Sequence, residues 1–122
     1  MKKQKNAENP LVGQMHPQML FTTLESLPGA TVERVLGVAF GSCVQTKHIG
    51  KDIGAGLRSV IGGEAKAYSE MMEDSRRTAT ERMMQQAHYM GANAVIGMRY
   101  TTAQTMPGAA EIIAYGTAVL VK

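Results

Sequence analysis

The chain has 122 residues, 44% of them hydrophobic and 19% charged, which is typical of one soluble globular domain. Its net charge is +3, and three lysines against one glutamate in residues 1–18 account for +2 of it, so the body lacks the dense basic face that nucleic-acid binding requires. The single cysteine excludes an internal disulfide, and the longest apolar run, residues 112–121, is too short to cross a bilayer. We expect a cytoplasmic protein with neither nucleic acid nor a membrane as partner.

The N-terminal residues 1–18 predict a flexible arm, because they contain Lys, Asn, Gln and two prolines without an apolar period. Order is expected to begin at Met19, so residues 19–122 form the single domain. Residues 31–43 (TVERVLGVAFGSC) predict a strand after a Pro28-Gly29 turn. Strict alternation would place Leu36, Val38 and Phe40 on one face and Val35, Gly37 and Ala39 on the other.

Two helices are expected in the middle of the chain. Residues 48–61 predict a short helix, which Gly62-Gly63 ends. Residues 64–90 predict a long one, with Gly91 suited to the left-handed position after its end and a Glu73–Arg77 ion pair on its outer face. Its inward stripe recurs every three or four positions, as Tyr68, Met72, Ser75, Ala79, Met83, Ala87 and Met90.

The C-terminal third predicts a hairpin, with strands at residues 92–101 and 111–122 around a Pro107-Gly108 turn. Strands flanking helices indicate a two-layer α/β fold of the α+β type, a small sheet with one long and one short helix. The last strand is apolar on both faces, with Ile112, Ala114, Ala118 and Leu120 on one and Ile113, Tyr115, Val119 and Val121 on the other.

A sheet covered by one helix layer should be polar on its free face, and this one is not. One long helix cannot cover both sides of the sheet. We therefore expect a second copy of the chain to cover the free face. The alternative is that the short helix and the first strand fold over it.

Four segments together resemble the YbjQ-like family, a small bacterial and archaeal family that carries a heavy-metal-binding label and no established activity. They are GAGLRSVIGGEAKAY (54–68), SRRTATERM (75–83), GANAVIGMRY (91–100) and YGTAVLV (115–121). The resemblance spans residues 19–122. It implies a two-layer α/β fold and a ring-like homo-oligomer, a pentamer. Ser75 stands where the family more often has Ala.

The stretch CVQTKHIGKD is a candidate metal site, since Cys43, His48 and Asp52 could supply three ligands to a divalent or soft metal ion. The neighbouring Lys47 and Lys51 oppose cation binding. A thiol enzyme with Cys43 as nucleophile and His48 as base is another interpretation, although no oxyanion donors can be identified. In the third interpretation, the stretch is a structural connection and Cys43 is a small buried hydrophobe at a strand end.

A candidate anion site lies at the start of the long helix. Free backbone N–H groups at Gly62 and Gly63 attract phosphate or carboxylate, and Arg58 and Lys66 are near in sequence. Glu64 opposes this interpretation, and we favour a simple turn between helices that needs a positive φ at glycine.

These features predict a small homo-oligomeric binding or scaffold protein, with a metal ion or small ligand at subunit contacts as its candidate cargo. The partner we expect is the chain itself. A thiol-dependent enzyme using Cys43 and a purely structural ring acting through protein partners are the alternatives. No catalytic apparatus is evident in the sequence.

Overall fold

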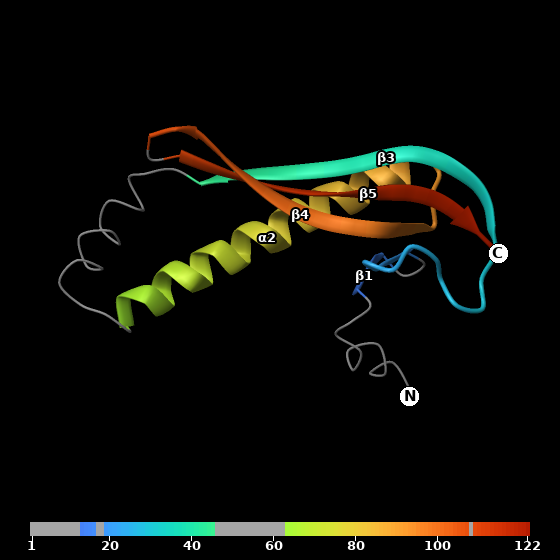
Figure 1. Ribbon diagram of the computed structural model, residues 1–122, viewed down its shortest axis with the longest axis horizontal. Helices are drawn as coiled ribbons and strands as arrows, with labels where there is room; N and C mark the ends of the chain where they lie inside the picture. Colours follow the sequence, from blue (N-terminus) through green and yellow to red (C-terminus); the bar gives the residue numbers. More distant parts are fainter. Residues whose placement is uncertain (1–12, 17–18, 46–62, 108) are drawn as a thin grey trace.

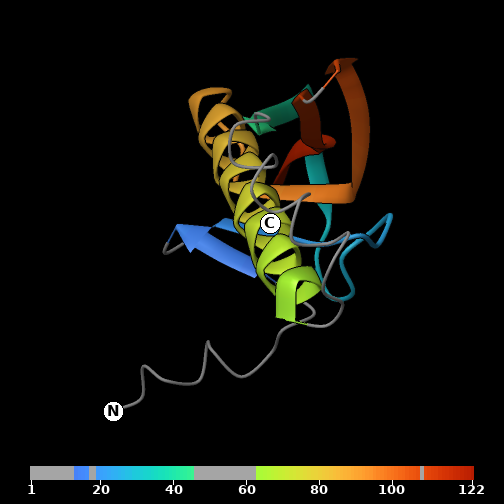
Figure 2. The ribbon, with the colours of Figure 1, turned by 90° about the vertical axis from the view of Figure 1, so that its left-hand side faces the viewer.

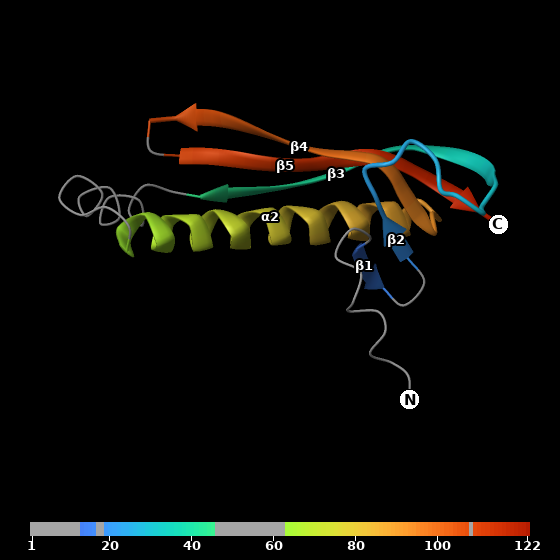
Figure 3. The ribbon, with the colours of Figure 1, turned by 60° about the horizontal axis from the view of Figure 1, so that its bottom comes forward.

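The computed structural model describes residues 13–16, 19–45, 63–107 and 109–122. Within them, five strands form one sheet in the order β1-β2-β4-β5-β3, and the long helix α2 packs against one face of it (Figure 1; Figure 3). β2 and β4 are parallel, and the other neighbouring strands are antiparallel. The elements are β1 (Gly13–His16), β2 (Met19–Phe21), β3 (Val32–Gln45), α2 (Gly63–Tyr89), β4 (Ala94–Met106) and β5 (Ala109–Val121).

This architecture confirms the expected α+β fold and the C-terminal hairpin. The long helix lies within one residue of its expected bounds, whereas β4 continues to Met106, beyond the expected end at residue 101. The predicted short helix at 48–61 lies outside the described residues. Within the range predicted as an arm, β1 pairs with β2. No helix in the described residues is long and apolar enough to span a membrane.

The main core lies between α2 and the facing side of β3, β4 and β5. Figure 2 shows these three strands on one side of the helix. From the predicted helix stripe, Ser75, Ala79, Met83 and Ala87 are buried, and the helix also buries Thr80 and Met84. Methionines fill much of the volume, because their flexible thioethers adapt to irregular gaps that rings would occupy in other cores. The sheet contributes mainly small and aliphatic residues, namely Ala39, Cys43, Val95, Met98, Ile112, Ala114 and Ala118.

Helix α2 ends where the sequence predicts. Gly91 has a φ of +93°, the left-handed conformation that glycine adopts without strain. The Gly91 N–H donates to the His88 carbonyl and the Ala92 N–H to the Ala87 carbonyl, both at 3.0 Å. These two bonds satisfy carbonyls of the last turn and define a Schellman cap.

The outer face of α2 carries an ion pair different from the expected one. Arg77 donates to Asp74 at 2.7 Å, not to Glu73. This hydrogen bond, assisted by the charge of Asp74, raises the pKa of Arg77. Since both side chains are largely exposed, the pair adds little to stability.

A bulge in β3 overturns the strict alternation expected for this strand. The register moves from Val35 opposite Val119 to Gly37 opposite Ala118, so one extra residue stands on β3. Leu36 consequently packs against the helix-side core, whereas Val38 and Phe40, placed on its face by the sequence pattern, are exposed. Gly37 has a φ of +133°, a conformation that side chains rarely tolerate.

Asn93 extends the sheet beyond the first residue of β4. Its side-chain amide donates to the Val121 carbonyl at 2.9 Å, and its side-chain oxygen accepts the Val121 N–H at 2.8 Å. Its own N–H donates to the Val119 carbonyl at 3.0 Å. The side chain therefore acts as a strand partner for the end of β5.

Gly41 sets the distance between helix and sheet. A Cβ atom there would lie 2.6 Å from both the Ala79 carbonyl oxygen and the Arg82 carbonyl carbon. Backbone atoms cannot give way as a side chain can, so α2 reaches this close only because residue 41 has no side chain.

We therefore expect Gly41→Ala to destabilise the protein by about 1 to 3 kcal/mol, because the added methyl group overpacks the contact with α2. Ser42→Ala, which changes a hydroxyl on the opposite face of the same strand, should stay within about 0.5 kcal/mol. Urea unfolding followed by circular dichroism measures both. Equal stability of the two variants would contradict this account of the contact.

Candidate functional site

The face of the sheet away from α2 is the most unusual surface of the described residues. In the register of β3 and β5, Phe40 lies opposite Tyr115 and Ser42 opposite Ile113. Val38, Phe40 and Val44 are 60%, 55% and 51% exposed. We call the set Val38, Phe40, Val44, Ile113 and Tyr115 the outer apolar face.

Only one end of this side of the sheet is covered within the described residues. There the connection between β2 and β3, residues 22–31, bonds to β4: the Gly97 N–H donates to the Leu24 carbonyl at 2.7 Å. Val119 and its register neighbour Ala94 are fully buried at this end, yet they lie outside the helix-side core. The first strands thus do not fold over the outer apolar face.

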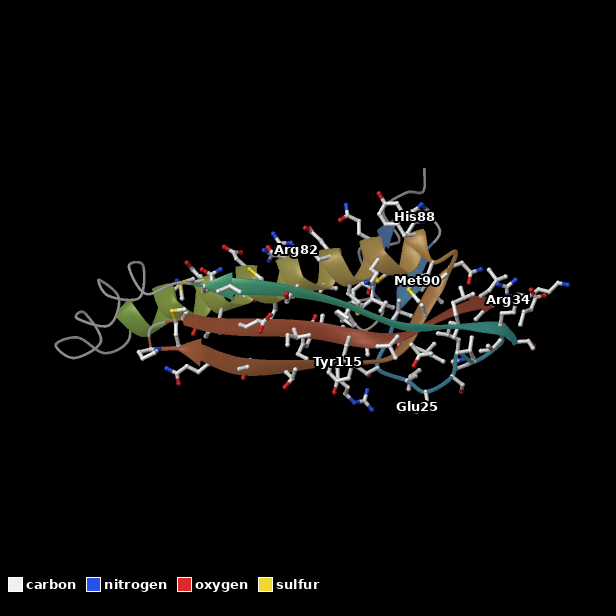
Figure 4. All side chains as sticks on the ribbon, turned by 90° about the horizontal axis from the view of Figure 1, so that it is seen from above. Glu25, Arg34, Arg82, His88, Met90 and Tyr115 are labelled. Carbon is white, nitrogen blue, oxygen red and sulfur yellow. The ribbon has the colours of Figure 1, made fainter. Side chains whose placement is uncertain are left out.

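Arg99 holds this connection to β4 at the border of the outer apolar face. It donates to the Thr23 carbonyl at 3.1 Å and pairs with Glu25 at 3.4 Å. Its register neighbour on β5 is Tyr115. In Figure 4, Tyr115 and Glu25 both lie on the side of the strands away from Arg82 of α2. The face is therefore apolar in its centre and carries charges at one border, a composition usual for protein interfaces.

The predicted metal ligands are not brought together by the described residues. Cys43 lies on the helix-facing side of β3, is only 9% exposed and belongs to the apolar core. Its Sγ accepts a hydrogen bond from Gln45 Nε2 at 3.7 Å. His48 and Asp52 lie outside the described residues, and the described ones contain no group of three His, Cys, Asp or Glu residues able to hold a metal.

The position of Cys43 also bears on the thiol-enzyme interpretation. A nucleophilic cysteine sits in a partly exposed, electropositive environment, and a thiol packed among apolar side chains is inert. Cys43 packs in the core beneath α2. Its surroundings match those of a small buried hydrophobe.

The predicted anion site is only partly described. Gly63 is the first residue of α2, and Lys66 is exposed in its first turn. Arg58 and Gly62 lie outside the described residues. A helix start alone does not make an anion site, so Arg58, Gly62, Gly63 and Lys66 stay a prediction from the sequence.

Two polar side chains that join the helix to the sheet could not be identified from the sequence. Gln86 and Arg82 of α2 bond to the backbone of β3, at the edge of the sheet. Their spacing of four residues was a readable signal, because residues i and i+4 lie on one side of a helix. Their target could not be read from the sequence, since it depends on how close α2 lies to β3.

Among the described residues, a five-stranded sheet with one long helix on one face defines the class of protein, a small two-layer α+β domain. A solved structure shares this fold: a protein of unknown function of the DUF74 family from Pediococcus pentosaceus, with a TM-score of 0.57 and 18% identity over 85% of this chain and 98% of that one. At this identity the likeness shows the fold alone.

The family follows from closer relatives. A UPF0145 protein of Archaeoglobus fulgidus is 50% identical over 105 residues, 86% of this chain and 97% of the relative. One from Thermus thermophilus is 53% identical over 102 residues, 84% of this chain and 90% of the relative. The YbjQ family model, described as "Putative heavy-metal-binding", matches residues 19–122. The chain belongs to this family, as its sequence motifs predict.

We expect Cys43→Ala to leave fold and assembly intact, with a loss of about 1 kcal/mol in unfolding free energy, the ordinary size of a single core substitution. Elemental analysis of tag-free wild type and variant, each with a chelated control, tests the metal interpretation in parallel. Stoichiometric zinc or copper in the wild type that disappears in the variant would show that Cys43 is a ligand after all.

Proposed function

We propose that the chain is the subunit of a homo-oligomeric binding or scaffold protein, joined to its neighbours through the outer apolar face. The observation that carries this proposal is the exposure of Val38, Phe40 and Val44 beside Ile113 and Tyr115, on strands whose other side forms the core. Contiguous exposed apolar surface marks an interaction site.

The energetics favour a protein partner over water at this face. Full burial of a Val, Ile or Phe side chain contributes about 1.5 to 3 kcal/mol. Side chains that are about half exposed retain a good part of that gain for association. Several such gains together are comparable to the whole stability of a small domain, about 5 to 15 kcal/mol.

A second copy of the chain is the partner that best fits the face. Most soluble oligomers are closed assemblies of identical subunits, in which each interface surface is buried against a neighbouring subunit. The family resemblance implies a ring, a pentamer. A ring would place ligand-binding residues of several copies close together, which is how a metal ion or small ligand at subunit contacts enters the proposal.

A catalytic role has less support. Cys43, the one nucleophile that the sequence offered, packs in the apolar core beneath α2, where thiols are unreactive. The metal proposal with His48 and Asp52 as ligands rests on the sequence and the family description only. A binding or scaffold role requires neither a reactive thiol nor a bound metal.

Two adjacent isoleucines separate assembly from folding. Ile113→Lys, on the outer apolar face, should give a folded chain of lower oligomer mass, because lysine opposes burial of that face. Ile112→Lys should unfold the chain, since Ile112 is 2% exposed in the core and an unpaired buried charge costs about 4 kcal/mol or more. Multi-angle light scattering and circular dichroism give mass and fold.

Gln85→Lys, on the exposed side of α2, is the matched control and should change neither property. An Ile113→Lys variant that keeps the wild-type mass would remove the outer apolar face from the interface. A folded wild-type monomer at micromolar concentration would refute the assembly itself.

A further inference from the structure

Strand β3 forms one border of the sheet, and two side chains of α2 bond to its outward backbone groups. The Phe40 N–H donates to Gln86 Oε1 at 2.7 Å, and Arg82 Nη1 donates to the Ser42 carbonyl at 2.7 Å. In an antiparallel edge strand, every second residue turns its N–H and C=O away from the sheet. Gln86 therefore occupies the N–H of Phe40. Arg82 occupies the carbonyl of Ser42, the next residue whose backbone groups turn away from the sheet.

The repeats of helix and strand match at this border. Residues four apart on a helix are separated by about 6 Å along its axis, and residues two apart on a strand by about 6.6 Å. Gln86 and Arg82 are four apart, and Phe40 and Ser42 are two apart. Because Gly41 lets α2 lie directly against β3, the side chains reach the border.

The two bonds lie in the middle of an aggregation-prone stretch. Val38, Phe40 and Val44, whose N–H and C=O groups also turn away from the sheet, are all more than half exposed. A long apolar edge strand with free N–H and C=O groups is a template for another strand, and natural proteins block such edges. The stretch itself carries no proline and no charge from Val35 to Gln45.

We propose that Gln86 and Arg82 close the edge of β3 against addition of a strand from a second copy of the chain. The excluded partner is β3 of that copy, because an antiparallel β3–β3 pair is self-complementary and needs no other surface. Two occupied positions at the centre of the strand interrupt the ladder that such a pair would form. This goes beyond the proposed function, since it concerns the edge of the sheet and not its face.

The double variant Arg82→Ala, Gln86→Ala tests the proposal. Compared with the wild type, it should form larger species whose mass rises with protein concentration in sedimentation velocity. The infrared amide I band should gain intermolecular β-structure. The matched control Arg77→Ala, Gln85→Ala removes the same side-chain types from the exposed side of α2 and should sediment like the wild type.

A second change distinguishes edge pairing from general stickiness. Ser42→Pro, added to the double variant, removes an outward N–H from β3, which an edge strand tolerates, and should restore wild-type sedimentation. A folded double variant with wild-type mass at every concentration would overturn the proposal. Larger species without new β-structure, or with no effect of Ser42→Pro, would overturn it too.

If the double variant fails to fold, Arg82→Ala alone decides, because it keeps the bond from Phe40 to Gln86. It should show a smaller gain in mass with concentration, and an unchanged mass would count against the proposal. Since the readout compares variant with wild type, it holds whether the wild type is a monomer or a ring. Failure of this test therefore leaves the proposed function untouched.

Discussion

The close approach of α2 to β3 at Gly41 governs the rest of the described structure. With no side chain at residue 41, helix backbone and strand backbone come nearly into contact. Small residues line both sides of this contact, Ala39 on the strand and Ala79 on the helix. Methionines fill the wider space around it, where their flexibility matches an irregular gap.

The same contact explains why α2 bonds to the edge of the sheet at β3 and why the two faces of the sheet differ in exposure. Because α2 lies against β3, its polar side chains reach the sheet edge and bond to it. Within the described residues one helix packs on one face of the sheet, so it does not cover the opposite face. The connection at residues 22–31 covers one end of that face, and the outer apolar face stays exposed within the described residues.

Periodicity in the sequence predicts the elements of this fold well. The long helix follows from its repeating inward stripe, its end from Gly91, and the hairpin from Pro107 between two apolar runs. In these places local patterns and tertiary structure agree. The alternation in β5 likewise predicts that Ile112 and Ile113 lie on opposite faces, and the structure adds that Ile112 is the one in the core.

The sequence could not predict features that depend on close tertiary geometry. The bulge in β3 moves Leu36 to the core side, and nothing in an alternating apolar pattern announces an extra residue. Asn93 reads as part of a strand, yet its side chain pairs with Val121. Cys43 is a candidate ligand by residue type, and its packing in the apolar core beneath α2 could not be predicted from the sequence.

Membership in the YbjQ family and the exposed sheet face bear on the function of the chain independently. The family description concerns metal, and the described residues expose an apolar sheet face. A binding or scaffold role at contacts between copies accommodates both, because the ligand would then depend on assembly. On this account, the side chains of the outer apolar face matter more for function than the lone thiol.

The most direct test is the mass of the untagged wild-type chain by light scattering across micromolar concentrations. The account predicts one species with a mass several times that of the chain, constant with dilution, as a closed assembly requires. A folded monomer over the whole range would contradict it.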